Sequence, residues 1–193
     1  MRARRQGPGG IIDIARIRRA RAGDAPAIAR LVHALNRQQG DHESRNIAGA
    51  LVRDALSTRR FIDIIVALLD EKIVGYALFT RAYETSYATR GLYLNDLYVA
   101  PAQRRRGIGR ALLAAVAREG KRREVTFLWW ASRPWNQDAH RFYAALGARM
   151  EPVFAHAITH RAFRALAAGG KKPATHKAKP RAKRKLSRVR RPT

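Results

Sequence analysis

The chain has 193 residues, and 46% of them are apolar, which is enough for one ordinary domain with a hydrophobic core. It contains no cysteine, which excludes disulfide scaffolds, cysteine nucleophiles and thiolate metal sites. No apolar run approaches the roughly 18 residues that a membrane span needs. No hydrophobic signal segment is visible at its start, so we expect a cytoplasmic protein without a membrane partner. Its 40 Lys and Arg against 14 Asp and Glu give a formal net charge of +26.

This positive charge is concentrated at the C-terminus. Residues 171–193 contain eleven Lys or Arg, no acid and only two large aliphatic side chains. Such a segment buries too little apolar surface to offset its ordering entropy. We therefore expect residues 169–193 to form a disordered basic tail that contacts nucleic acid or another polyanion, and residues 1–13 to form a flexible lead. Without residues 1–14 and 171–193, the body still has 26 basic and 13 acidic residues, a balance that attracts anions.

The first half of the chain predicts two helices and a hairpin. A short strand is expected over 14–18, and a helix follows the turn at Gly23 and Asp24. A second helix is expected over 43–56. The runs 61–69 and 73–80 are rich in apolar and β-branched residues and are separated by three charged residues, which predicts two antiparallel strands.

The second half of the chain predicts alternating strands and helices. Strands are expected over 92–99, 125–131 and 152–158, and helices over 107–118, 136–146 and 161–168. This order predicts an α/β fold in which one domain, residues 14–168, holds a mixed sheet flanked by helices.

The turn between the predicted strand 92–99 and helix 107–118 is suited to binding phosphate. The free N–H groups at a helix N-terminus point toward the positive end of the helix dipole, and glycines let phosphate oxygens approach the backbone. Two known glycine motifs do not fit. Gly109 is followed by Arg110 and not by the Lys of a P-loop, and Leu112 stands where a dinucleotide fingerprint has its third glycine.

The pattern Arg104-x-x-Gly107-x-Gly109 resembles motif A of the GNAT superfamily of acetyl-CoA-dependent N-acetyltransferases. Downstream, the stretch from Asn136 to Gly147 is similar to motif B, N-x-x-A-x-x-F-Y-x-x-x-G. The stretch LYLNDLYV, residues 92–99, looks closest to the spermidine/spermine acetyltransferase branch, which has Leu-Glu-Asp-Leu-Tyr-Val there. The resemblance covers residues 14–166 and implies a single-domain GNAT fold, with a mostly antiparallel sheet and a splay between its central strands. It implies transferase, and specifically acyltransferase, activity: acetyl passes from acetyl-CoA to a primary amine by direct attack.

The resemblance also implies the cofactor contacts. Backbone groups of one strand would pair with the pantetheine arm: Leu97, Tyr98 and Val99. Backbone N–H groups of the following turn would hold the pyrophosphate: Arg105, Arg106, Gly107, Ile108, Gly109 and Arg110. The side chains of Arg104, Arg105 and Arg106 would add charge-assisted contacts. Asn136 would bond the pantetheine arm, and Tyr143 would protonate the leaving thiolate.

The reaction also needs a base, because an alkyl amine with a pKa of about 10.4 is almost entirely protonated at pH 7 and only the neutral form attacks. The polyamine branch has Glu where this chain has Asn95. We expect the base to be Asp96, a nearby carboxylate such as Glu84, or a water held by Asn95. In a regular strand Asp96 lies on the pleat face opposite Asn95.

The acceptor is expected to contact Asn95, Glu84 and Trp130, with three tyrosines as further candidates for the pocket: Tyr83, Tyr87 and Tyr93. The net charge of the body opposes a polycation. Spermidine is therefore one candidate among small amines, amino-acid-like compounds and peptide or protein amines. Dimerisation is common in this branch, and the sequence leaves a homodimer open.

Two other interpretations of the sequence are a metal site and a nucleic-acid-binding function. His156 and His160 are four residues apart but have no third ligand, so no metal is expected. The rival function is a nucleic-acid-binding protein that acts through its basic tail, with the folded domain as a carrier.

Overall fold

The computed structural model describes residues 15–42 and 44–169. The predicted lead (1–13) and all of the predicted tail (169–193) except Gly169 lie outside the described residues. The chain divides into two compact units, Met1–Ala148 and Arg149–Thr193.

The first unit is built on a five-stranded sheet with the order β1-β2-β3-β4-β5. Strands β1 to β4 pair with one another in antiparallel fashion, and β5 pairs with β4 in parallel. Asp70 and Glu71 form the turn between β2 and β3 in the left-handed backbone region, with φ of 46° and 59°. This sheet confirms the predicted α/β fold class. The strands are β1 (Arg16–Arg19), β2 (Asp63–Leu69), β3 (Lys72–Glu84), β4 (Thr89–Val99) and β5 (Phe127–Trp129).

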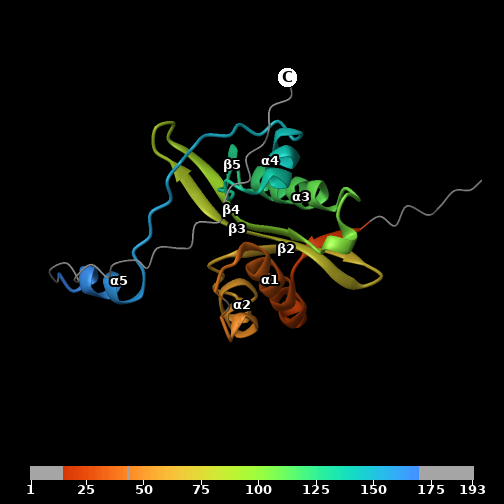
Figure 1. Cartoon of the computed structure of the whole chain (residues 1–193), viewed down its shortest axis with the longest axis horizontal. Helices are drawn as coiled ribbons and strands as arrows, with labels where there is room; N and C mark the ends of the chain where they lie inside the picture. The colour runs from red at the N-terminus through yellow and green to blue at the C-terminus, as the bar shows by residue number, and fades with distance from the viewer. Residues whose placement is uncertain (1–14, 43, 170–193) are drawn as a thin grey trace, which may run out of the picture. The chain divides into compact units, whose positions relative to one another are not determined.

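Helices cover both faces of this sheet (Figure 1). Helices α1 (Ala25–Gln39) and α2 (Ile47–Ala55) pack on one face, where Tyr76 and Val66 are fully buried. Helices α3 (Ile108–Arg122) and α4 (Gln137–Ala144) lie on the other, where Leu112 and Phe79 are buried. We call these two apolar layers the α1 face and the α3 face of the sheet. The 3-10 turns η1 (Ala22–Asp24) and η2 (Pro101–Gln103) precede α1 and follow β4.

Strand β4 is irregular at Asn95. Leu78 pairs with Asp96 and the next residue of β3, Phe79, pairs with Leu94, so Asn95 is an extra residue in the ladder. Leu94 therefore packs in the α3 face while Asp96 bonds to Tyr76 of the α1 face. The condition of a regular strand is therefore not met here, because a bulge breaks the two-residue alternation of side chains.

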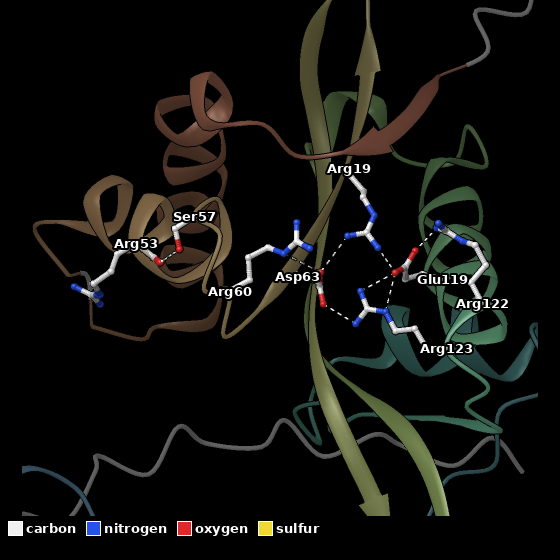
Figure 2. A network of polar contacts seen from close by, with 8 residues as sticks. All are labelled: Arg19, Arg53, Ser57, Arg60, Asp63, Glu119, Arg122 and Arg123. Carbon is white, nitrogen blue, oxygen red and sulfur yellow. Dashed lines mark hydrogen bonds and ion pairs between the residues drawn. The ribbon is translucent and has the colours of Figure 1, made fainter.

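A buried carboxylate joins β1, β2 and α3. The side chain of Glu119 is 4% exposed and accepts hydrogen bonds from the guanidinium groups of Arg19, Arg122 and Arg123. Arg19 and Arg123 also reach Asp63 on β2, at 3.3 and 2.8 Å, so one network of charges links three elements (Figure 2).

The second unit contains one described helix, α5 (His160–Ala167), which confirms the predicted closing helix to within one residue. The predicted strand over 152–158 is wrong, because none of these residues lies in a helix or strand. Val153, Phe154 and Ile158 fit a strand pattern, yet each is more than half exposed. A strand needs a neighbour to complete its hydrogen bonds, and none of the described strands pairs with this segment.

Candidate active site

The turn between β4 and α3 leaves a row of backbone N–H groups free. Arg105 and Gly107 both adopt the left-handed region, with φ of 63° and 76°, and α3 begins at Ile108. Among the described residues, none of the N–H groups of residues 105–110 donates to a backbone acceptor, and the first N–H bonded back to the turn is that of Ala111. Nothing lies within 4 Å of the position that a Cβ on Gly107 would occupy. Consecutive free donors at a helix N-terminus form a site for phosphate oxygens.

Two arginine side chains of this turn are held within the protein. Arg104 Nε donates to the carbonyl oxygen of Val99 at 2.9 Å, and its Nη2 donates to Gln38 Oε1 at 2.7 Å. Its guanidinium also lies 5.6 Å from the ring centre of Tyr98. Arg106 Nη1 donates to Gln103 Oε1 at 2.6 Å. The guanidinium groups of Arg104 and Arg106 therefore brace the turn against β4, α1 and η2.

The second half of β4 has a free edge on its β5 side. The parallel pairing of the two strands ends at Tyr93 and Trp129, and no described strand continues it. The predicted pantetheine contacts Leu97, Tyr98 and Val99 lie on this half of β4. An unpaired strand edge beside a row of free helix N–H groups fits an extended, amide-containing chain that ends in a pyrophosphate. The residues present therefore fit coenzyme A.

One candidate residue lies on α4 and another caps its N-terminus. Asn136 caps this helix, because its Oδ1 accepts from the N–H of Ala139 at 3.2 Å. Tyr143 packs in the α3 face, with its ring centre 4.9 Å from that of Trp130 and 5.2 Å from that of Phe142. Burial raises the pKa of Tyr143 to about 12, so its hydroxyl holds its proton at neutral pH.

The bulge places Asp96 beside a buried tyrosine. Tyr76 is 0% exposed, and its hydroxyl donates to Asp96 Oδ2 at 3.1 Å. Burial raises the pKa of Asp96, the hydrogen bond from Tyr76 acts in the opposite direction, and the charge of Asp41 raises it further. A carboxylate whose pKa is moved toward neutrality is suited to accept a proton.

An open cavity of about 800 Å³ lies at the end of the β3–β4 hairpin where the turn joins the two strands. Within it the rings of Tyr93 and Trp129 are 5.4 Å apart. Glu84 also lines it and accepts a hydrogen bond from the N–H of Ser86 at 3.0 Å. The lining residues are Thr80, Arg81, Ala82, Tyr83, Glu84, Tyr87, Thr89, Tyr93, Thr126, Phe127 and Trp129.

The structure brings some predicted site residues together and separates others. The predicted acceptor residue Trp130 packs on Tyr143, whereas its neighbour Trp129 lines the cavity. Asn95 is exposed at the bulge. Sequence analysis missed Tyr76, because its contact with Asp96 depends on the pairing of β3 with β4 and on the bulge.

A second feature that the sequence did not indicate joins the loop after α1 to the loop before α4. The carboxylate of Asp41, after α1, accepts hydrogen bonds from the guanidinium of Arg133, before α4, at 2.7 and 3.0 Å.

Among the described residues, no three His, Asp or Glu side chains gather as metal ligands. None of the helices in residues 15–42 and 44–169 is both long and apolar enough to cross a membrane.

Comparison with known proteins places these features in a family. Residues 29–148, which run from α1 through α4, match the model of the Acetyltransferase (GNAT) family. A thialysine N-epsilon-acetyltransferase of Bos taurus is 31% identical over 142 residues, 69% of this chain and 83% of that protein.

Two further relatives match over a smaller share of their own length. The L-ornithine N5-acetyltransferase NATA1 of Arabidopsis thaliana is 34% identical over 83 residues, 43% of this chain and 36% of that protein. The human spermidine/spermine N(1)-acetyltransferase-like protein 1 is 27% identical over 145 residues, 71% of this chain and 21% of that protein. The chain thus spans about a third of the plant relative and about a fifth of the human one.

A solved structure shares the fold. The Vibrio cholerae integron cassette protein VCH_CASS6 superposes with a TM-score of 0.65 at 21% identity, over 79% of this chain and 97% of that one. The family match and the bovine relative confirm the resemblance seen in the sequence: the chain belongs to the acetyltransferase (GNAT) family and is an acetyl-CoA-dependent N-acetyltransferase.

Proposed function

We propose that the chain acetylates a primary amine bound on the α1 face of β4, between Asp96 and the cavity. The observation that carries this proposal is the bulge at Asn95, which turns Asp96 toward that face. Tyr93 lines the cavity three residues earlier on the same strand. At about 3.3 Å per residue, the two positions are roughly 10 Å apart, and the free edge of β4 begins between them.

Bound acetyl-CoA supplies an acetyl group activated as a thioester. The free N–H groups of residues 105–110 would hold its pyrophosphate. Backbone groups of Leu97, Tyr98 and Val99, at the free edge of β4, would pair with its pantetheine arm. Asn136 would bond this arm through its side-chain amide, while its Oδ1 continues to cap α4.

The proposed chemistry uses two side chains with opposite tasks. Asp96 takes a proton from the ammonium group of the acceptor, and the neutral nitrogen then attacks the thioester carbonyl. The new N–C bond forms, the C–S bond breaks, and Tyr143 donates its proton to the departing sulfur. The second proton that the nitrogen loses on becoming an amide restores the Tyr143 phenol, and the proton held by Asp96 passes to water. Burial fits both residues to these tasks, because it raises the pKa of Asp96 toward neutrality and keeps the Tyr143 hydroxyl protonated.

A diamino acid is the acceptor class that we favour over a polyamine. Its side chain offers a primary amine, and its carboxylate lowers the repulsion from a body with 26 basic and 13 acidic residues. Two relatives are named for thialysine and for ornithine, which are compounds of this class. Tyr93 and Trp129 would contact the carbon chain of the acceptor. Glu84 pairs with Thr89, seven residues before Asp96 and roughly 20 Å away at 3.3 Å per residue, so its charge would draw cationic acceptors into the cavity without binding the second amine directly.

An amine panel tests the acceptor class. The full chain with acetyl-CoA is offered ornithine, thialysine, lysine, spermidine and a peptide, and the release of free thiol is measured. We expect the highest kcat/KM with a free diamino acid. A preference for spermidine or for the peptide by tenfold or more would contradict this choice.

The base is tested on the best acceptor of the panel. Asp96→Asn is expected to remove the acidic limb of the pH profile of kcat/KM. A Glu84→Gln variant separates the two carboxylates, because it should raise KM and leave that limb in place.

The basic segment 171–193 lies outside the described residues, and its eleven cations suggest a separate task. We propose on charge alone that it contacts a polyanion such as nucleic acid. Removing residues 171–193 should abolish salt-dependent retention on DNA and leave acetyl transfer intact. If both properties are kept or both are lost, the two tasks are not separate.

A further inference from the structure

Tyr76 is the buried residue that contacts the proposed base most directly. Its side chain is 0% exposed on β3, in the layer between the sheet and α1. A buried phenol hydroxyl needs a hydrogen-bond partner. Among the described residues, the structure gives it Asp96 Oδ2, at 3.1 Å. A phenylalanine would fill the same space without this bond, so packing alone does not account for the hydroxyl.

The register of the sheet explains how the two side chains meet. Tyr76 lies opposite Tyr98, and Leu78 lies opposite Asp96, so Tyr76 and Asp96 are diagonal neighbours on paired strands. Diagonal neighbours come within reach of long aromatic side chains when they share a face. Asp96 shares this face only because Asn95 is inserted before it, so the bulge and the hydrogen bond form one local arrangement.

The other groups that act on Asp96 do not replace this bond. Asp41, from the loop after α1, opposes a negative charge on Asp96 and is itself paired with Arg133. The ring of Tyr98 is 6.3 Å from the ring of Tyr76. In the described part of the chain, the Tyr76 hydroxyl is the one hydrogen-bond donor that the structure gives to the Asp96 carboxylate.

We propose that Tyr76 is a positioning residue for acetyl transfer. Its hydroxyl holds Asp96 Oδ2 and thereby leaves Oδ1 to face the acceptor amine. The same bond stabilises the ionised form of Asp96 against its buried surroundings, which keeps the carboxylate able to accept a proton near neutral pH. This inference rests on the proposed function, in which Asp96 is the base.

The test compares pH profiles of kcat/KM for the full chain and for Tyr76→Phe, which keeps the ring and removes the hydroxyl. Without its donor, the carboxylate binds a proton more readily, so the acidic limb should move to higher pH. Below neutral pH we expect a loss of about tenfold, the size of one hydrogen bond to a charged group, and the loss should shrink as pH rises. Affinity for acetyl-CoA should be unchanged.

Ser57→Ala is the matched control, because it also removes one hydrogen-bonded hydroxyl, the donor to the Arg53 carbonyl at 2.7 Å. It should leave the profile unchanged. A loss in Tyr76→Phe that is equal at every pH, or an unmoved acidic limb, would overturn the positioning role. If Asp96→Asn keeps the wild-type acidic limb, the base assignment is wrong and the inference falls with it. If Asp96→Asn loses the limb while Tyr76→Phe keeps it, only the inference about Tyr76 is wrong.

A measurement on the unaltered chain covers the case in which Tyr76→Phe does not fold. NMR of protein labelled with ¹³C-tyrosine should show a hydroxyl proton of Tyr76 that exchanges slowly with water. A hydroxyl proton in fast exchange would overturn the hydrogen bond, and the inference with it.

Discussion

Glu119 is expected to be among the most costly charged residues to replace, because three guanidinium groups converge on a carboxylate that is 4% exposed. The substitution Glu119→Gln keeps the shape of the side chain but removes its charge. It also places an amide N–H₂ among groups that are all donors. Arg19 and Arg123 would lose one of their two carboxylates and keep only Asp63 (Figure 2).

The size of the loss follows from the exposure of the partners. Removing one member of a buried ion pair costs about 3–5 kcal/mol. Here the side chains of Arg19, Arg122 and Arg123 are 41%, 67% and 23% exposed, so water partly replaces the lost partner. We therefore expect a loss of about 2–3 kcal/mol in the free energy of unfolding. For a domain of this size, that lowers Tm by roughly 5–10 °C.

The chain offers a matched control on α4. Asp138 and Arg141 have the same three-residue spacing as Glu119 and Arg122, but their side chains are 87% and 71% exposed. Asp138→Asn should change the free energy of unfolding by no more than about 0.5 kcal/mol. Both variants are compared with the unaltered chain by urea unfolding followed by circular dichroism, with linear extrapolation. If the two variants lose the same small amount, burial of Glu119 does not set its contribution.

Three further predictions concern the turn, the first helix and the leaving group. Gly107→Val should weaken acetyl-CoA binding by about tenfold or more in calorimetry, because φ of 76° strains any side chain there; Gly147→Val, at φ of 81°, carries a similar strain and should leave the Kd unchanged. The hydrogen bond from Arg18 lowers the pKa of Asp24, so this pair stabilises the fold above about pH 4 and its contribution is lost as pH falls. Asp24→Asn should therefore cost about 1–2 kcal/mol at pH 7, and the gap between its unfolding curve and that of the unaltered chain should close in acid; a gap that is constant with pH would refute the linkage. Tyr143→Phe should lower kcat by about a hundredfold and barely change KM, and an unchanged kcat in single-turnover kinetics would exclude Tyr143 as the acid.

The local parts of the fold could be predicted from the sequence. The β2–β3 hairpin and helix α3 each follow from a run of apolar residues bounded by a turn signal. The turn for which we propose phosphate binding was predictable for the same reason, because Gly107 and the helix that follows it are adjacent in the chain.

Contacts across the sheet could not be predicted in the same way. The alternation of Trp129 and Trp130 shows that they face opposite sides, but only the pairing of β5 with β4 decides which one reaches the cavity. Asn95 carries no local signal of a bulge, because the extra residue exists only relative to β3. Residues 152–158 show the reverse case. Their local pattern predicts a strand, but no described strand pairs with this segment, and the pattern alone does not form one.

Binding of the pyrophosphate by free backbone N–H groups is the central claim, and amide NMR tests it most directly. The ¹⁵N-labelled full chain is titrated with acetyl-CoA and, separately, with S-acetylpantetheine, which lacks the pyrophosphate. Acetyl-CoA should shift the amide resonances of residues 105–110 more than any others, whereas S-acetylpantetheine should leave them in place. Acetyl-CoA binding that leaves the resonances of residues 105–110 unchanged would contradict the claim.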